Sequence, residues 1–483
     1  MYLGLDLGTS GLRALLVDGG GAPVASLSES YATTHPHPGW SEQDPAVWVA
    51  AVDRVLSRMA AERPGDMAQI KGIGVSGHMH GAVCLDDVGT VVRPCILWND
   101  TRSHAEAARL DDAPQVRALS GNIVFPGFTA PKLVWMAAHE PETFARVATV
   151  VLPAGYMNFH LTGETFADMS DSAGTSWLDT GARDWSGPLL SAGGMRREQM
   201  PRLIEGSEVG GTLRRNLAER WGMRGDVAVV GGAGDNAASA CGVGAMREGE
   251  GFVSLGTSGV LLTGRDGYAP KPESAVHTFC HAVPGQWYQM GVILAATDSL
   301  NWLSRVTGAP PAELSKELGE TISGPARLRF LPYLSGERTP HNDARIRGGF
   351  LNIEQATDRR AMTQAVMEGV AFALGDCARA LGQTGADLHS MLAIGGGAAS
   401  HFWVETIATV LGVPLDLPEA GDFGAALGAA RLAMVGCGAG TVEEIMVRPG
   451  VRATVEPVIA LAGTYAEAFA AYRATYPAIR DLS

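Results

Sequence analysis

The first thirty residues form short apolar runs separated by turn residues. Apolar positions dominate 2–6, 12–17 and 24–27, and glycine, serine and proline lie between these runs. Short alternating runs bounded by such residues are typical of β-strands. We therefore expect the chain to begin with an antiparallel meander whose first turn is rich in small hydroxyl residues.

A helical period replaces this alternation after residue 43. Asp44 and Pro45 give a start signal, because Asp is a good N-cap and proline is favoured at the first helical position. The apolar residues that follow fall on one helical face: Trp48, Val52, Val55, Leu56 and Met59. A buried strand is expected at 70–76, and helices alternate with short strands from there on. This alternation predicts an α/β fold.

One pentapeptide occurs twice in the chain. Leu-Gly-Thr-Ser-Gly at 7–11 returns letter for letter at 255–259, 248 residues later, and both copies join two apolar runs. A repeated strand–turn–strand unit at half the chain length indicates two copies of one fold. A chain of 483 residues is also long for one hydrophobic core. We predict two domains, 1–245 and 246–483, that meet across a cleft.

The repeated turn has the composition of a phosphate-binding loop. Glycines let another molecule approach the main chain, and the hydroxyls of Thr9, Ser10, Thr257 and Ser258 add hydrogen-bond donors. For either copy alone, an ordinary hairpin turn is the simpler interpretation. Two such turns facing each other favour a grip on a polyphosphate from both sides.

A carboxylate distinguishes the two copies. Asp6 precedes the first turn where Ser254 precedes the second. A phosphate clamp needs a hard cation, and Mg²⁺ is usually held by one or two carboxylates with water completing its shell. We therefore expect Asp6 to hold Mg²⁺ through water. The alternative is a turn carboxylate that bonds its own backbone.

A second acidic residue follows an apolar strand expected at 227–231. Asp235 and Asn236 come after Gly-Ala-Gly and open a helix of small residues that ends near Gly244. Asp235 can be a simple helix N-cap. It can also be a general base for a hydroxyl group, because the helix dipole and free N–H groups would keep it ionised and oriented.

Three glycines, Gly395, Gly396 and Gly397, follow a strand expected at 391–394 and precede a helix from about 400 to 411. Glycines at such a corner permit flat contact with a nucleotide base or ribose. On their own they are weak evidence.

Composition narrows the classes of partner and compartment. The net charge is −14 and the pI is near 5.3, so binding to nucleic acid or to an anionic membrane is disfavoured. The start of the chain has no cationic segment, and no apolar run approaches the ~20 residues that span a bilayer. The six cysteines show no metal-binding spacing and are expected to be buried thiols. We expect a cytoplasmic protein.

These residues resemble the FGGY family of carbohydrate kinases over nearly the whole chain. The general part of the resemblance comprises 4–10, 234–236, 256–258 and 395–397. A narrower part is similar to the members that phosphorylate D-xylulose and comprises His37–Pro45, Gly77–Gly81, Ile96–Asp100, Gly127–Trp135, Asp168–Asp171 and Lys271–His277.

The resemblance implies two ribonuclease H-like domains of the actin and hexokinase type that close over a central cleft. It implies transfer of the ATP γ-phosphate to D-xylulose, with Mg²⁺ as cofactor. It implies that Asp235 is the general base and that Asp6 is the carboxylate near the metal and the phosphates. Sugar contacts would come from Met79, His80 and Asn236. Phosphate contacts would come from Thr9 and Thr257, and adenosine contacts from Gly395, Gly396 and Gly397. Trp98, Asn99 and Asp100 would line the sugar pocket. The resemblance is also compatible with a homodimer.

Departures and alternatives accompany this interpretation. Arg13 replaces a customary lysine, Ala399 an arginine and Ala138 a polar residue, which affects the expected nucleotide contacts more than the reaction. The nearest alternative substrate is D-ribulose or a pentitol. An actin- or chaperone-like ATPase and an inactive sugar sensor are the alternatives from other classes.

Overall fold

The N-terminal strands form the predicted antiparallel meander. The structure, a computed structural model, describes residues 1–419 and 424–482. β1 (Tyr2–Leu7) pairs antiparallel with β2 (Gly11–Val17), and β2 pairs with β3 (Pro23–Ser30). The leucines of β1 are fully buried. Because a one-residue slip would turn them to the other face, their burial fixes the register.

The meander is one edge of a larger mixed sheet. β5 (Gly72–Gly77) lies parallel to β1 on the side away from β2, and the order is β13-β14-β5-β1-β2-β3, with β15 also paired to β5. The strand predicted at 70–76 starts two residues late, because the Ile70 amide donates to the Met67 carbonyl in the turn after α2.

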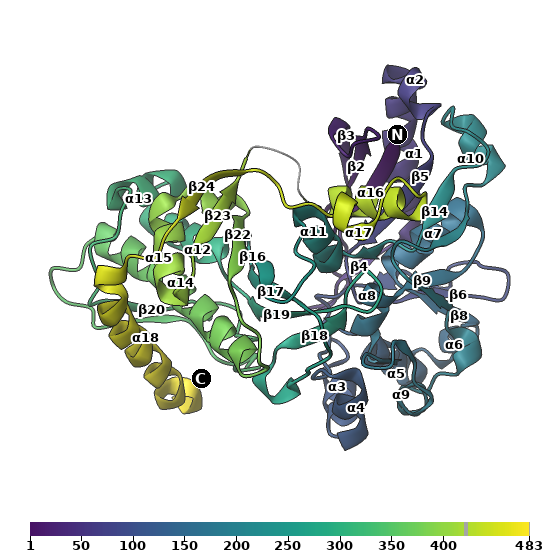
Figure 1. Ribbon diagram of the computed structural model, residues 1–483. Helices are drawn as coiled ribbons and strands as arrows, with labels where there is room; N and C mark the ends of the chain where they lie inside the picture. Colours follow the sequence, from purple (N-terminus) through teal and green to yellow (C-terminus); the bar gives the residue numbers. More distant parts are fainter. Residues whose placement is uncertain (420–423, 483) are drawn as a thin grey trace. The chain divides into compact units, whose positions relative to one another are not determined.

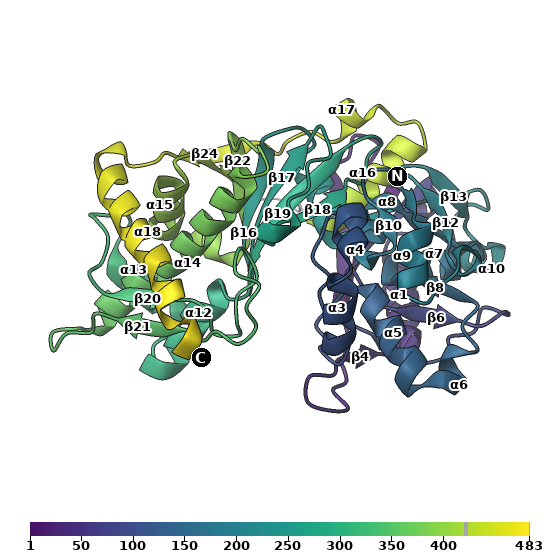
Figure 2. The same cartoon turned by 90° about the horizontal axis from the view of Figure 1, so that it is seen from below.

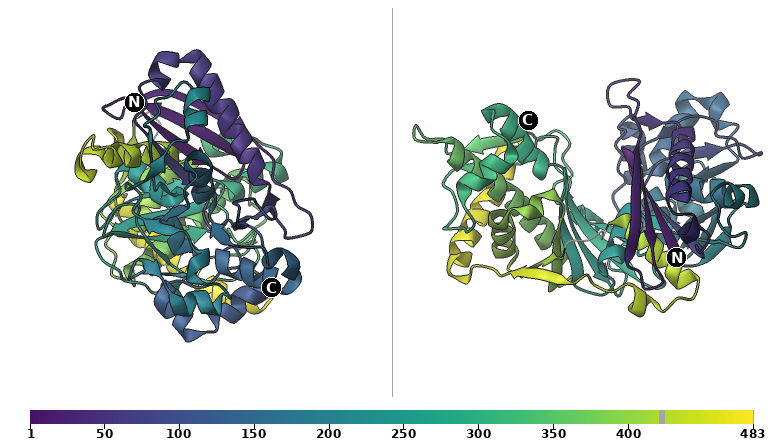
Figure 3. Two further views of the ribbon diagram at one scale, coloured as in Figure 1. Left: turned by 90° about the vertical axis from the view of Figure 1, so that its right-hand side faces the viewer. Right: turned by 90° about the horizontal axis from the view of Figure 1, so that it is seen from above.

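Helix α1 (Pro45–Glu62) begins where the sequence predicts. The Asp44 carboxylate accepts from the Ala46 amide at 2.9 Å, and Pro45 opens the helix. All of the predicted apolar residues on its inner face are buried, and they pack over β2 and β3. Figure 3 shows the strands of the meander and α1, in purple, lying side by side.

The second half of the chain repeats this design. β16 (Glu250–Leu255) and β17 (Gly259–Arg265) correspond to β1 and β2. Each begins and ends 248 residues after its counterpart. β22 (Ser390–Ile394) runs parallel to β16, as β5 does to β1. The second sheet has the order β18-β19-β17-β16-β22-β23-β24. The predicted repeat and the mixed α/β fold class are therefore confirmed.

The remaining elements complete the two layered units. The other strands are β4 (Glu42–Gln43), β6 (Val83–Leu85), β7 (Cys95–Ile96), β8 (Thr149–Val151), β9 (Phe166–Asp168), β10 (Leu178–Asp179), β11 (Asp184–Trp185), β12 (Arg202–Ile204), β13 (Val209–Thr212), β14 (Ala228–Val230), β15 (Ala233–Gly234), β18 (His277–Cys280), β19 (Trp287–Ile293), β20 (Arg329–Leu331), β21 (Gly349–Leu351), β23 (Leu415–Pro418) and β24 (Val451–Val455). The helices that precede residue 245 are α2 (Pro64–Met67), α3 (His104–Asp111), α4 (Pro114–Ser120), α5 (Thr129–His139), α6 (Pro141–Phe144), α7 (Pro153–Thr162), α8 (Met169–Ser172), α9 (Gly187–Ala192), α10 (Arg215–Arg220) and α11 (Asp235–Val243). Those that follow are α12 (Thr297–Thr307), α13 (Pro311–Leu318), α14 (Arg359–Gly382), α15 (His401–Leu411), α16 (Ala425–Gly436), α17 (Val442–Ile445) and α18 (Ile459–Ile479).

The described chain divides into two compact units, which we call unit 1 and unit 2. Unit 1 contains Met1–Met246, Phe279–Trp287 and the stretch with α16 and α17 that ends at Arg448, and unit 2 contains the rest. In unit 2, α14, α15 and α18 pack together (Figure 2). The predicted ranges 1–245 and 246–483 stay predictions, as does the expectation that the domains close over a cleft.

Helix α16 packs on the first sheet, although it comes from the far end of the chain. It contacts β1, β5 and α11 (Figure 1). Gly4 and Gly74 are register partners in β1 and β5. A Cβ at Gly4 would lie 1.8 Å from the Ala426 carbonyl oxygen, and one at Gly74 would lie 2.0 Å from that of Ala429. The two glycines therefore let the backbone of α16 approach the sheet directly.

We expect Gly74→Ala to lower the free energy of unfolding by about 1–3 kcal/mol or more, because its new methyl group would meet backbone that cannot move aside. Gly65→Ala is the matched control, since a Cβ there meets nothing within 4 Å. Urea unfolding of both variants measures the difference. Equal stability of the two would show that α16 does not pack this closely.

The cysteines and the helices bear on two expectations from composition. Five of the six cysteines are buried, whereas Cys437, at the end of α16, is only half-buried. Among the residues described here, no helix combines the length and apolar character needed to cross a membrane.

Candidate active site

The predicted carboxylates lie around the carboxyl end of β5. Asp6 of β1 and Ala233 of β15 are both register partners of Ser76, from opposite sides of β5. The Ser76 hydroxyl donates to Asp6 Oδ1 at 3.2 Å. Asp6 lies two residues after Gly4, so it faces the side of the sheet that α11 and α16 cover. Asp235 is the first residue of α11.

Asp235 therefore stands at the N-terminus of a helix, as predicted. The helix N-cap is Gly234 and not Asp235 itself. Asp235 Oδ1 accepts hydrogen bonds from the backbone N–H of Asn236 at 2.7 Å and from its side-chain amide at 2.9 Å. Asn236 thus orients the carboxylate, and these contacts involve only one of its two oxygens.

Burial and a neighbouring charge change the proton affinity of Asp235. Burial raises the pKa of its carboxyl group to about 7, and the negative charge of Asp6 adds to this effect, while the Asn236 hydrogen bonds oppose it. The ordinary value is near 4. A carboxylate with a pKa near 7 is a better proton acceptor at neutral pH than an unperturbed one.

A buried acidic segment supports the start of α11. The Gly234 amide donates to the Ser170 hydroxyl at 3.1 Å, and that hydroxyl donates to Asp168 Oδ1 at 2.5 Å. Burial raises the pKa of Asp168 to about 6. The pKa of buried Asp171 lies well above its ordinary value because of burial and the charges of Asp168 and Asp235. In the sequence this segment was visible only as a string shared with the family.

The turn after β5 carries Met79 and His80. Met79 packs against Gly234, where a Cβ would lie 2.8 Å from Met79 Cγ. His80 adopts a left-handed backbone conformation with φ of 69°, and its Nδ1 lies 2.7 Å from the Gly174 carbonyl oxygen. Its ring stacks on Phe128 at a centroid distance of 4.4 Å. Met79, Asp6, Asp235 and Asn236 are thus brought together at one end of β5, with His80 following in the same turn.

The neighbouring histidine has a different environment. His78 is buried, and neither ring nitrogen has a hydrogen-bond partner in the described structure. Its ring lies edge-on to Trp48 at 5.5 Å. Burial lowers its pKa to about 3, so His78 is a neutral core residue at physiological pH.

The first repeated turn is held by side chains of unit 1. The Gly8 carbonyl accepts from the Tyr31 hydroxyl at 2.6 Å, and the Thr9 carbonyl accepts from Gln43 Nε2 at 2.6 Å. The Thr9 hydroxyl accepts from Trp98 Nε1 at 3.0 Å. Trp98 therefore reaches the predicted phosphate turn rather than lying in an isolated loop.

The second turn has the same sequence but a different register. Leu7 pairs with Leu12, whereas Leu255 pairs with Gly259, so the second turn is one residue shorter. The carbonyls of Gly256 and Thr257 accept from the Thr297 and Ala296 amides at the start of α12. Identical residues therefore take different pairings, and the carbonyls of the second turn bond to a helix start.

Two of the three glycines of unit 2, Gly396 and Gly397, line a cavity. Gly395 has φ of 89° and its backbone lies against Leu255, next to the second turn. Gly396 and Gly397 line a cavity of about 500 Å³ together with Thr297, Leu300, Asn301, Pro311, Ala312, Ser315, Lys316, Gly319, Glu320, Met367, Ala399, Ser400, His401 and Trp403. The sequence did not predict the lining residues from α12 and α13, because their spacing forms no recognisable motif. Ala399, one of the departures from the expected pattern, lies in this lining.

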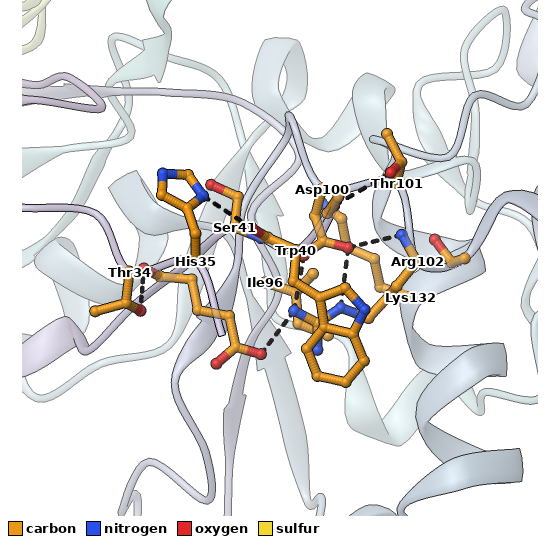
Figure 4. A network of polar contacts seen from close by, with 12 residues as sticks. Thr34, His35, Trp40, Ser41, Ile96, Asp100, Thr101, Arg102 and Lys132 are labelled. Atoms are coloured by element: carbon orange, nitrogen blue, oxygen red, sulfur yellow. Dashed lines mark hydrogen bonds and ion pairs between the residues drawn. The ribbon is translucent and has the colours of Figure 1, made fainter. Parts of the chain in front are cut away.

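Asp100 lies in a buried polar network. Asp100 accepts from the guanidinium of Arg102 and from the Ser41 amide, and the Arg102 guanidinium lies 3.5 Å from the Trp40 ring centre (Figure 4). Asp100 is buried, and its side chain is fully used in these contacts. Asn99 is exposed. The expected place of Trp98, Asn99 and Asp100 in the sugar pocket stays a prediction.

The two other departures are on β2 and α5. Arg13 is directly opposite Asp6 in β2, and its Nε donates to Ser26 at 3.0 Å. Ala138 is exposed on α5.

Comparison with known proteins defines the class. The models for the N-terminal and C-terminal domains of the FGGY family of carbohydrate kinases match residues 1–242 and 251–437. The chain therefore belongs to this family, and the predicted two-domain fold of actin and hexokinase type and the predicted class, an ATP-dependent carbohydrate kinase, are confirmed.

Individual relatives are more specific. The chain is 44% identical to the xylulose kinase of Escherichia coli strain K12 over 439 residues, 90% of each chain. It is 55% identical to a xyloylose kinase of known structure from Brucella ovis, with a TM-score of 0.98 over the full length of both. A gluconate kinase structure from Lactobacillus acidophilus is 26% identical with a TM-score of 0.92, covering 99% of this chain and 97% of the other. Similarity of fold therefore does not by itself select the sugar.

Proposed function

We propose that this kinase transfers the γ-phosphate of ATP to the terminal hydroxyl of D-xylulose, giving D-xylulose 5-phosphate and ADP. The observation that carries the proposal is the cluster at the end of β5, where Asp6, Asp235 and the Met79–His80 turn lie together. The 44% identity to a xylulose kinase supports this choice of sugar.

In the proposed mechanism, unit 1 binds and orients the sugar. Met79, His80 and Asn236 contact it, and Asp235 accepts the hydroxyl proton as the hydroxyl oxygen attacks phosphorus. The lone pair of that oxygen forms the new P–O bond, and the bond to the ADP oxygen breaks. Because Asp235 has a raised pKa, it takes this proton more readily than an ordinary carboxylate would. Positioning and electrostatics supply most of the rate in such transfers.

Nucleotide contacts are assigned to both repeated turns and to unit 2. Thr9 and Thr257 are proposed to face the phosphates, and Gly395, Gly396 and Gly397 the adenosine, next to the 500 Å³ cavity. A cavity of this size fits the usual range for small-ligand pockets.

Asp6 is proposed to hold Mg²⁺ through water. Its carboxylate and the nearby Ser76 hydroxyl are hard oxygen donors, and Asp235 adds a second negative charge close by. Mg²⁺ commonly binds one or two carboxylates together with waters and phosphate, so this donor set fits it. When bound, the ion would neutralise charge on the transferring phosphate. A homodimer stays a prediction.

The proposal is tested by ADP release from MgATP with D-xylulose, D-ribulose, a pentitol, glycerol or no sugar. We expect D-xylulose to give the largest stimulation. A larger stimulation by D-ribulose or a pentitol would retain the kinase and replace the substrate. Hydrolysis indifferent to every sugar would contradict the proposal.

A further inference from the structure

A lysine on α5 lies completely inside unit 1. Lys132 has no exposed surface, and its ammonium group donates to the carbonyl oxygens of His80 and Gly127, each at 2.7 Å. Buried lysines are rare, and an ammonium group removed from water is costly unless hydrogen-bonded. No step of the proposed mechanism uses this charge.

The turn of Met79 and His80, which we call the sugar turn, has an unusual backbone conformation at His80. A non-glycine residue at φ of 69° is uncommon and costs conformational energy. Lys132 holds the His80 carbonyl together with the Thr129 hydroxyl, which donates to it at 3.1 Å. Both donors come from α5, so one helix fixes the backbone of the turn.

The second carbonyl connects the same ammonium to another loop. The Gly127 backbone lies directly against Trp98, because a Cβ at Gly127 would lie 2.0 Å from the Trp98 carbonyl oxygen. Trp98 in turn donates to the Thr9 hydroxyl in the first repeated turn. Lys132 thus lies between the sugar turn and the loop that reaches the predicted phosphate turn.

Lys132 is also close to the polar network around Asp100 (Figure 4). Burial lowers the pKa of Lys132 to about 7, while Cys95 and Asp100 act to raise it. Its hydrogen bonds, however, go to backbone carbonyls. It therefore acts on backbone geometry rather than as an ion-pair partner.

We propose that Lys132 is a positioning residue for the sugar: its ammonium group, with the Thr129 hydroxyl, holds His80 in the left-handed conformation that directs the imidazole toward the substrate. The proposal rests on the proposed function only in requiring a sugar at His80. It does not depend on which sugar that is.

The test uses Lys132→Met, which retains the apolar stem and removes the ammonium group. The assay uses the sugar that stimulates the wild type most. We expect the KM for this sugar to rise about tenfold in the variant, while the KM for ATP and kcat stay within about twofold of the wild-type values. Thr129→Val, which removes the weaker donor and keeps the charge, is expected to raise the sugar KM about threefold. It serves as the second variant if Lys132→Met does not fold.

A cycle with His80→Gly distinguishes positioning from general stability. Glycine adopts positive φ without strain and lacks the imidazole, so adding Lys132→Met to His80→Gly should change the sugar KM by less than about twofold. If the two substitutions instead raise the sugar KM independently, so that their separate factors multiply in the double variant, this result would overturn the proposal. So would an unchanged sugar KM in folded Lys132→Met or, if it does not fold, in Thr129→Val. If the wild type shows no sugar-stimulated ADP release at all, the proposed function has failed instead.

Discussion

Asp235→Asn is expected to lower kcat by about 10²–10⁴, the usual contribution of a general base, while the KM of the sugar changes little. The variant keeps the size of the side chain and an oxygen that can accept the two Asn236 donors. What it loses is the ability to accept a proton. Steady-state kinetics with saturating MgATP measure the loss, and a fall of less than about tenfold would contradict the role of base.

The pH profile gives a second readout of the same prediction. Burial and the charge of Asp6 raise the pKa of Asp235 to about 7. Because the base acts without its proton, wild-type kcat/KM should fall as pH decreases through about 7. The residual activity of Asp235→Asn should lack this acid limb. Asp226→Asn, an exposed carboxylate paired with Arg224 in the same unit, is the control and should keep wild-type kinetics.

Elements with a local signal were predicted well from the sequence. The meander, the start of α1 at Pro45 and the repeat of two strands 248 residues apart all follow from alternation, capping and identity of letters. The placement of Asp235 at the start of a helix came from the same kind of signal.

Contacts between distant segments could not be predicted in this way. The packing of α16 on Gly4 and Gly74 joins residues more than 300 positions apart, and nothing in either stretch specifies the partner. The repeated turns differ by one residue in register although their sequences are identical, and the second turn contacts the start of α12, which is distant in the chain. Likewise, the polar lining that α12 and α13 give to the cavity has no periodic or motif signature.

Chemical environment was the least predictable property of the site. Two histidines that the sequence does not distinguish have different environments. His78 is neutral inside the core, whereas the ring of His80 stacks on Phe128 beside the site. Lys132 reads as an ordinary helical lysine until its buried contacts are seen. The family strings marked such positions without giving the physical reason for them.

Asp6→Asn is expected to lower kcat by about 10²–10³, the size of effect seen when a group that stabilises transition-state charge is lost. The variant can still accept the Ser76 hydrogen bond, so the fold around β5 should persist. Removal of the carboxylate should also raise the Mg²⁺ concentration needed for half-maximal rate. Titrating Mg²⁺ at fixed ATP, corrected for the MgATP complex, measures this shift.

The same substitution has a signed effect on Asp235. The charge of Asp6 raises the pKa of Asp235, so removing that charge should move the acid limb of kcat/KM to lower pH. Ser76→Ala is the matched variant, because it removes the hydroxyl donor but keeps the charge; its acid limb should stay near the wild-type position. If Asp6→Asn leaves both the Mg²⁺ requirement and the acid limb unchanged, Asp6 neither holds the ion nor sets the basicity of Asp235, and its role is confined to supporting the end of β1.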